Sequence, residues 1–117
     1  MDVVYPGFGS IVVDGVTYHH DVILEGGEVR PRRKKASRPH KHHYGHTPLS
    51  AAEDIPWSRP RLIIGSGHSG RLPVMDEVGE KAGTLGVELV IVPTAHACEL
   101  IRALDGAEVN AVLHVTC

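Results

Sequence analysis

The sequence predicts one small α/β domain, residues 1–117, whose second half is a strand–helix–strand–helix–strand unit over residues 61–117. Mostly apolar runs at 61–64 and 87–92 have the pattern of buried strands, and residues 109–115 predict the last strand. Between these runs, apolar residues recur at helical spacing. Strands that alternate with helices indicate a largely parallel sheet covered by helices. A chain of 117 residues is long enough to bury one core.

The composition is that of an ordinary globular protein. The chain is 42% hydrophobic and 22% charged, and its formal net charge of −2 argues neither for nor against nucleic-acid binding. Its two cysteines, Cys98 and Cys117, are too few for a disulfide framework. We see no signal peptide and no apolar run as long as a membrane span. The sequence therefore predicts a cytoplasmic protein without a membrane partner.

Residues 7–31 predict a small β-meander. Asp14-Gly15 lies between two apolar stretches and favours a two-residue hairpin turn, because both residue types tolerate positive φ. From residue 16 to residue 24 apolar and polar residues alternate, which predicts one strand with one buried face. Gly26-Gly27 predicts a second tight turn.

Residues 32–49 predict a basic, histidine-rich loop, because few apolar side chains are available to pack there. We expect a basic surface made of Arg30, Arg32, Arg33, Lys34 and Lys35. Such a surface can steer an anionic ligand or an acidic partner. Nucleic acid is disfavoured as the partner, because no aromatic stacking platform accompanies the charge.

Four histidines in this stretch invite comparison with a metal site. They are His40, His42, His43 and His46. Imidazoles this close together can bind zinc, but structural sites usually take paired ligands from two segments, and the basic neighbours here would oppose a cation. We predict no metal site and no cofactor.

Two polar residues just beyond this loop, Ser50 and Glu53, have the spacing of a helix capping box. They predict a short helix through Asp54 that Pro56 stops.

A glycine turn, Gly65 to Gly70, follows the strand at 61–64 and matches G-x-G-x-x-G. In dinucleotide-binding domains this turn and a helix N-terminus hold a pyrophosphate. Here Pro73 delays the helix and no acid follows the strand that ends at Val92, so a structural turn is favoured over a dinucleotide site. Binding of a smaller anion stays open, because successive backbone N–H groups can form a concave donor site.

The carboxyl ends of parallel strands meet at one sheet edge, where open α/β sheets bind ligands. The sequence places a candidate ligand pocket there, made of Gly65, Ser66, Gly67, His68, Thr94, His96, Thr116 and Cys117. Thr94 is also a candidate N-cap of the following helix. His114 and Cys117 could form a base and a nucleophile, but three residues apart on a strand they point to opposite faces. No catalytic residue is therefore predicted, and Cys98 is assigned to the core.

The chain also resembles a known family, the Mth-type domains of unknown function. The resemblance is carried by FGSIVVDGVTYHHDVIL, HTPLS, LIIGSGHSGRLPV, VELVIVPTAHACELIRAL and the closing HVTC, which together run from Phe8 to Cys117. This family includes adipogenesis-associated Mth-domain proteins and a mitochondrial complex I assembly factor, and the chain is most similar to its archaeal and bacterial branch. The resemblance implies three layers: a mixed central sheet with helices on one side, and a helix with the small meander on the other. It implies no reaction.

Two functions follow as hypotheses. No complete catalytic set is visible, and the eukaryotic members of the family look like assembly or regulatory factors that act through protein contacts. The resemblance therefore implies a non-enzymatic protein-binding, assembly or regulatory domain with an unknown protein partner, and an exposed meander edge makes a homodimer plausible. The alternative is a small-molecule or anion binder, or an enzyme, with its site at the Gly65–Gly70 edge.

Overall fold

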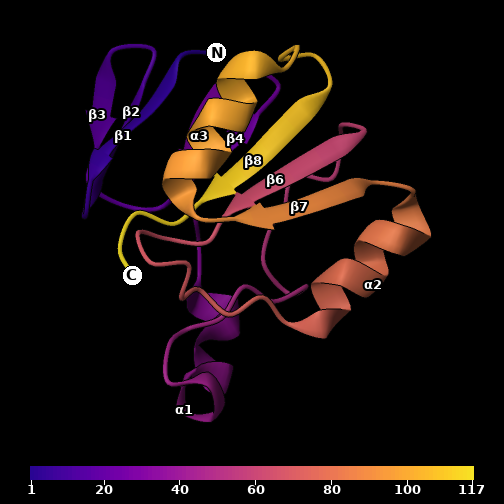
Figure 1. The fold of residues 1–117 in the computed structure, drawn as a ribbon. Helices are drawn as coiled ribbons and strands as arrows, with labels where there is room; N and C mark the ends of the chain where they lie inside the picture. The colour runs from indigo at the N-terminus through magenta and orange to yellow at the C-terminus, as the bar shows by residue number, and fades with distance from the viewer.

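Two β-sheets organise the computed structural model, which describes all 117 residues (Figure 1). The five-stranded sheet has the order β5 (Glu28–Pro31), β4 (Val22–Glu25), β8 (Val109–Leu113), β6 (Arg61–Gly65) and β7 (Glu88–Val92). The three-stranded sheet consists of β1 (Val3–Gly7), β2 (Ser10–Val13) and β3 (Val16–Tyr18). In the larger sheet β6 pairs in parallel with β7 and β8, whereas β4 pairs antiparallel with β5 and β8. The central sheet is therefore mixed.

The fold has three layers, because successive side chains of each central strand point to opposite faces of the sheet. On β6, Ile63 packs with Ala97 of α3 (Thr94–Ala103), and the same face carries Val3 and Ile11 of the small sheet. Ile64 faces the other way, into a second cluster with α2 (Asp76–Leu85) and the chain from Leu49 to Leu72. Thus α3 and β1–β3 cover one face and α2 covers the other, as the resemblance implies.

The unit from β6 to β8 forms as its sequence pattern predicts. β6, α2, β7, α3 and β8 follow one another, and α2 ends where Gly86 adopts the left-handed conformation, with φ of 69°. One detail differs, because β7 is an edge strand rather than a fully buried one, and its Ile91 is 46% exposed. No helix of the structure combines the length and the apolar character that crossing a membrane would need.

The prediction of one meander over residues 7–31 is wrong. β3 stops at Tyr18, and the chain bends at residues 19 and 20 before β4 joins the central sheet. The reason is Ile23, which is buried like its neighbours Val22 and Leu24, so that β4 needs cover on both faces. The predicted Asp14-Gly15 turn does join β2 to β3, with φ of 48° and 83° at its two residues.

Two further local predictions are wrong. Residues 50–53 form a turn rather than a helix, since the Ser50 hydroxyl and the Glu53 carboxylate bind other side chains instead of capping. The stretch predicted as a loop contains a 3₁₀-helix, η1 (Lys35–His40), followed by one turn of helix, α1 (Lys41–Tyr44), which Figure 1 shows projecting beyond the sheet.

Candidate functional site

The glycine turn closes upon the segment that follows β8. Every backbone N–H from residue 66 to residue 72 donates a hydrogen bond within the protein. The acceptors, taken along the turn, are Val92 O, Thr94 Oγ1, Thr116 O, Cys117 O, Gly67 O, Cys117 O again and Ser66 O. No N–H of this turn is left to bind an anion or a pyrophosphate, so the backbone anion site that the sequence left open does not form, and the favoured structural turn does.

Gly67 shows how tightly this turn holds the following segment. Its φ of 105° favours glycine, and an added Cβ would lie 2.6 Å from the Cys117 carbonyl oxygen and 2.7 Å from that of Thr116. Thr94 is not the N-cap of α3, since its hydroxyl instead accepts the Gly67 N–H and donates to the His114 carbonyl at 2.6 Å. The glycine turn thus acts as a clamp on residues 114–117.

The chain leaves the sheet before His114, and this changes the directions in which the side chains of residues 114–117 point. β8 ends at Leu113, so the alternation that would separate His114 from Cys117 does not apply to them. Both residues line one pocket, together with Thr116. The expectation that His114 and Cys117 lie on opposite faces is wrong for this reason.

That pocket has a volume of about 160 Å³ and lies between the segment after β8 and the stretch that contains η1 and α1. Its lining is Arg32, Lys34, Lys41, His46, Thr47, Leu72, His114, Thr116 and Cys117. No aspartate or glutamate belongs to this set. Lys34 and Lys41 form no salt bridge within the protein, so their ammonium groups are free to meet a ligand.

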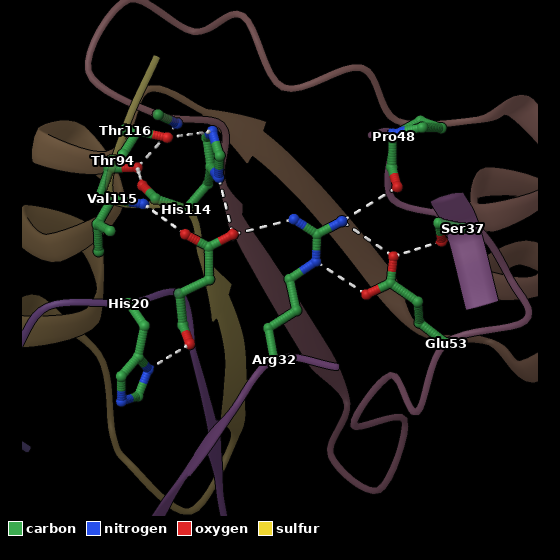
Figure 2. Close-up of polar contacts among 11 residues, drawn as sticks. His20, Arg32, Ser37, Pro48, Glu53, Thr94, His114, Val115 and Thr116 are labelled. Carbon is green, nitrogen blue, oxygen red and sulfur yellow. Dashed lines mark hydrogen bonds and ion pairs between the residues drawn. The ribbon is translucent and has the colours of Figure 1, made fainter. Parts of the chain in front are cut away.

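A chain of hydrogen bonds reaches the pocket from the Asp21 carboxylate (Figure 2). Asp21 Oδ2 lies 2.8 Å from His114 Nδ1, and its Oδ1 accepts the Val115 N–H at 2.9 Å. On the other side of the ring, His114 Nε2 lies 3.2 Å from Thr116 Oγ1. The carboxylate therefore fixes the imidazole, and the free nitrogen of the imidazole faces a hydroxyl of the pocket.

Behind Asp21 lies a buried ion pair. The Arg32 side chain is 1% exposed, and its Nη1 donates a hydrogen bond to Asp21 Oδ2 at 2.9 Å. Its Nε and Nη2 donate to the two carboxylate oxygens of Glu53, at 2.8 and 2.9 Å. The Ser37 hydroxyl donates to Glu53 and lies 2.6 Å from that of Ser50. Burial alone would lower the pKa of Arg32, but the hydrogen bonds and charges of the two carboxylates raise it.

The same contacts set the charge of Asp21. Burial raises the pKa of Asp21, but three neighbours lower it by more, so the pKa is lower than usual. These neighbours are His114, through its hydrogen bond and its charge, the Val115 N–H, and the charge of Arg32. Because the folded pKa lies below the unfolded one, the ionised carboxylate stabilises the fold above pH of about 4, and this stabilisation is lost as the pH falls further.

We therefore expect Asp21→Asn to destabilise the protein strongly at pH 6 and much less at pH 2.5. The measurement is the free energy of urea unfolding of both proteins at the two pH values. Asp2→Asn, at an exposed aspartate, is the control. A difference between wild type and Asp21→Asn that does not shrink in acid would contradict this account of the carboxylate.

The residues predicted for the site divide into three groups. The glycine turn, Thr94, Thr116 and Cys117 do come together. His96 is exposed on α3 and makes no hydrogen bond with them. His68 is turned toward Tyr5 of β1 and toward Phe8 on the turn after it.

Burial raises the pKa of Cys98 to about 11, which keeps that core thiol protonated.

The predicted basic surface is smaller than expected. Arg33, Lys34 and Lys35 are exposed, but Arg30 is half-buried and pairs with Glu25 and Asp54. The assignment of Arg32 to this surface is wrong, because two carboxylates hold it inside the protein.

A larger pocket, of about 380 Å³, lies at the opposite end of β8, next to the β4–β5 turn. Its polar lining groups already hold loops together: the Asn110 amide binds Pro56 O, Ser58 and Gly26 N, and Arg59 donates to Ala107 O. No chain of hydrogen bonds like that from Asp21 reaches it, so we place the candidate site at the smaller pocket.

Sequence reasoning missed five residues of this arrangement. They are Asp21, Lys41, His46 and Glu53, together with the interior position of Arg32. Asp21 and His114 are 93 residues apart, and no local pattern links them. The spacing of Ser50 and Glu53 indicated that their side chains form hydrogen bonds. Their partners are Ser37 and Arg32, which are distant in sequence, and not the backbone of a helix. No three His, Cys, Asp or Glu side chains lie close enough together to hold a metal ion.

Comparisons with known proteins address the fold. A scan against protein-family models finds no match, and a search of the curated proteins finds no similar sequence. Among solved structures, the conserved hypothetical protein PH1505 of Pyrococcus horikoshii OT3 matches with 25% identity and a TM-score of 0.83, over 100% of both chains. A protein named MT938 also has 25% identity, over 98% of this chain and 99% of its own, with a TM-score of 0.65.

A more distant likeness extends this result. A Bordetella pertussis protein, described as a Mth938-like domain, has 20% identity and a TM-score of 0.60, over 97% of this chain and 84% of its own. That likeness bears on the fold alone. By its fold and its full-length matches, the chain is similar to the Mth938-like domains.

Proposed function

We propose that this protein binds a small oxyanion, such as a phosphate, sulfate or carboxylate group, in the pocket between η1, α1 and the segment after β8. This pocket is called the anion pocket below. The observation that supports the proposal most is the composition of the pocket lining. Lys34, Lys41 and His46 line the pocket, and no carboxylate does. An unpaired cationic pocket attracts anions and favours those that can accept several hydrogen bonds.

The size of the anion pocket limits the ligand. A volume of 160 Å³ is the space of about five water molecules, at about 30 Å³ each. Sulfate and phosphate ions, with five heavy atoms, fit this space, and so does the anionic group of a larger ligand. The hydroxyls of Thr47 and Thr116 can donate hydrogen bonds to it.

The two lysines provide the test. We expect sulfate and inorganic phosphate to bind saturably at low ionic strength, and we expect the double variant Lys34→Ala, Lys41→Ala to bind at least about tenfold more weakly, because two of the nearby charges are lost. Binding is followed by isothermal titration calorimetry and by amide chemical shifts. Both anions should bind more weakly at high sodium chloride concentration.

Lys35→Ala is the matched control, because Lys35 is exposed beside Lys34 but does not line the anion pocket. We expect it to change the dissociation constant less than about twofold. A non-saturating titration would refute the proposal. So would equal weakening by Lys35→Ala, since net charge rather than the pocket would then explain the binding.

Protein binding without catalysis is the second candidate function, and one observation favours it. Phe8, on the turn between β1 and β2, is 62% exposed, and Val4 of β1 is 42% exposed. Exposed apolar side chains of this size are common at protein interfaces. Gentle crosslinking separates the two candidates: a specific partner lost with Phe8→Ser, with sulfate binding unchanged, would support this role.

A further inference from the structure

The anion pocket contains a histidine whose two ring nitrogens have different partners. Asp21 is ionised, because its pKa is lowered, and an ionised carboxylate can only accept hydrogen bonds. The hydrogen between Asp21 Oδ2 and His114 Nδ1 therefore belongs to His114. In the neutral imidazole the lone pair is then on Nε2, which faces Thr116 and the pocket.

Thr116 allows both charge states of this ring. A hydroxyl group can donate or accept, so Thr116 Oγ1 can donate to Nε2 when His114 is neutral and accept from it when His114 is protonated. Protonation thus breaks no hydrogen bond. Asp21 already provides a negative charge 2.8 Å from the other nitrogen, as is usual where a histidine takes up and releases protons.

His114 lies between charges of both signs. Asp21 is adjacent and favours the charged form, but Arg32 behind it neutralises part of that effect. On the pocket side, the ammonium groups of Lys34 and Lys41 disfavour a further positive charge, and His46 and Cys117 are the remaining titratable groups. A dianion among these groups would reverse the balance, so ligand binding and protonation must favour each other.

We propose that His114 is the acid–base group of the anion pocket, and that it takes up one proton at Nε2 when a doubly charged oxyanion binds. The proton comes from solvent, the Nε2–H bond forms, and the new N–H donates to Thr116 Oγ1, whose own hydroxyl hydrogen is then free to donate to the ligand. On release the proton returns to solvent. The ligand class is a phosphate or phosphate-monoester dianion, which can exchange that proton itself, its second pKa being about 6. This inference rests on the proposed anion binding.

The experiment counts protons with sulfate as the probe, because sulfate itself does not titrate near neutral pH. Sulfate is titrated into the protein at pH 7.5 in Tris and in triethanolamine, two buffers without an oxyanion group that differ in their enthalpy of ionisation. The difference in observed heat gives the number of protons taken up per bound sulfate. We expect uptake approaching one proton for wild type and none for His114→Gln, which should still bind sulfate with lower affinity.

Two matched histidines identify the group. His46 also lines the pocket and is the other candidate proton acceptor, whereas His96 is exposed on α3 and lies outside it. We expect His46→Gln and His96→Gln to keep the proton uptake. In nitrogen-15 spectra of the imidazoles, His114 should carry its proton on Nδ1 in the free protein and on both nitrogens with sulfate bound.

The outcomes are distinct. Sulfate binding without proton uptake, or uptake that persists in His114→Gln or disappears in His46→Gln, overturns this inference and leaves the anion pocket in place. A complete absence of saturable sulfate binding refutes the proposed function, and the inference with it.

Discussion

Replacing Arg32 with methionine is expected to lower the free energy of unfolding by about 3 to 5 kcal/mol. The Arg32 guanidinium is 1% exposed and neutralises two carboxylates that have left water with it, Asp21 and Glu53. Methionine fills similar space but leaves the buried Glu53 carboxylate with the Ser37 hydroxyl as its one side-chain partner. Equilibrium unfolding in urea, followed by circular dichroism at pH 7, measures the loss.

The next residue provides the control. Arg33 has the same charge and side chain, but it is exposed and forms no ion pair. Arg33→Met should change the unfolding free energy by less than about 0.5 kcal/mol. If the two variants lower the free energy of unfolding equally, the buried ion pairs of Arg32 do not stabilise this part of the fold.

Gly67→Ala is expected to lower the free energy of unfolding by about 3 kcal/mol, from backbone strain at positive φ together with overpacking. The new Cβ would overlap the carbonyl groups of Thr116 and Cys117, so one side of the clamp must move. The amide protons of His68 and Arg71, which donate to those carbonyls, should then exchange with solvent much faster than in wild type. Urea unfolding and hydrogen exchange measure the two effects.

Gly79→Ala makes the same chemical change where nothing opposes it. Gly79 lies within α2, and no atom comes within 4 Å of the added methyl group. This variant should gain about 0.5 to 1 kcal/mol, because alanine favours a helix interior over glycine. If Gly67→Ala were as well tolerated as Gly79→Ala, the glycine turn would not be a clamp.

The sequence predicts those parts of the fold that local patterns encode. The unit from β6 to β8 follows from apolar runs and helical spacing, and the hairpin turn at Asp14-Gly15 follows from the two residue types that accept positive φ. The placement of β4 could not be predicted in the same way. Its alternation with residues 16–18 suits a half-exposed strand, and only the antiparallel pairing with β8 decides otherwise.

The candidate site was harder to predict, because its contacts join distant parts of the chain. Asp21 meets His114 across 93 residues, and Arg32 meets Glu53 across 21. A charged residue in a basic stretch is usually exposed, which explains the error at Arg32. The glycine turn was found correctly as a landmark, but its N–H groups bind the protein's own carbonyls, a use that the G-x-G-x-x-G pattern does not distinguish from ligand binding.

The place of β8 in the central sheet also bears on how the protein is made. β8 is the last strand in chain order, yet it joins the β4–β5 hairpin to β6 and β7. A chain emerging from the ribosome therefore holds two halves of a sheet with no strand between them, and the edges of β4 and β6 that face β8 stay unpaired until synthesis has passed residue 113. Folding must then close contacts of long sequence separation, which is intrinsically slow. The anion pocket, built from the residues just beyond β8, can form only after that step.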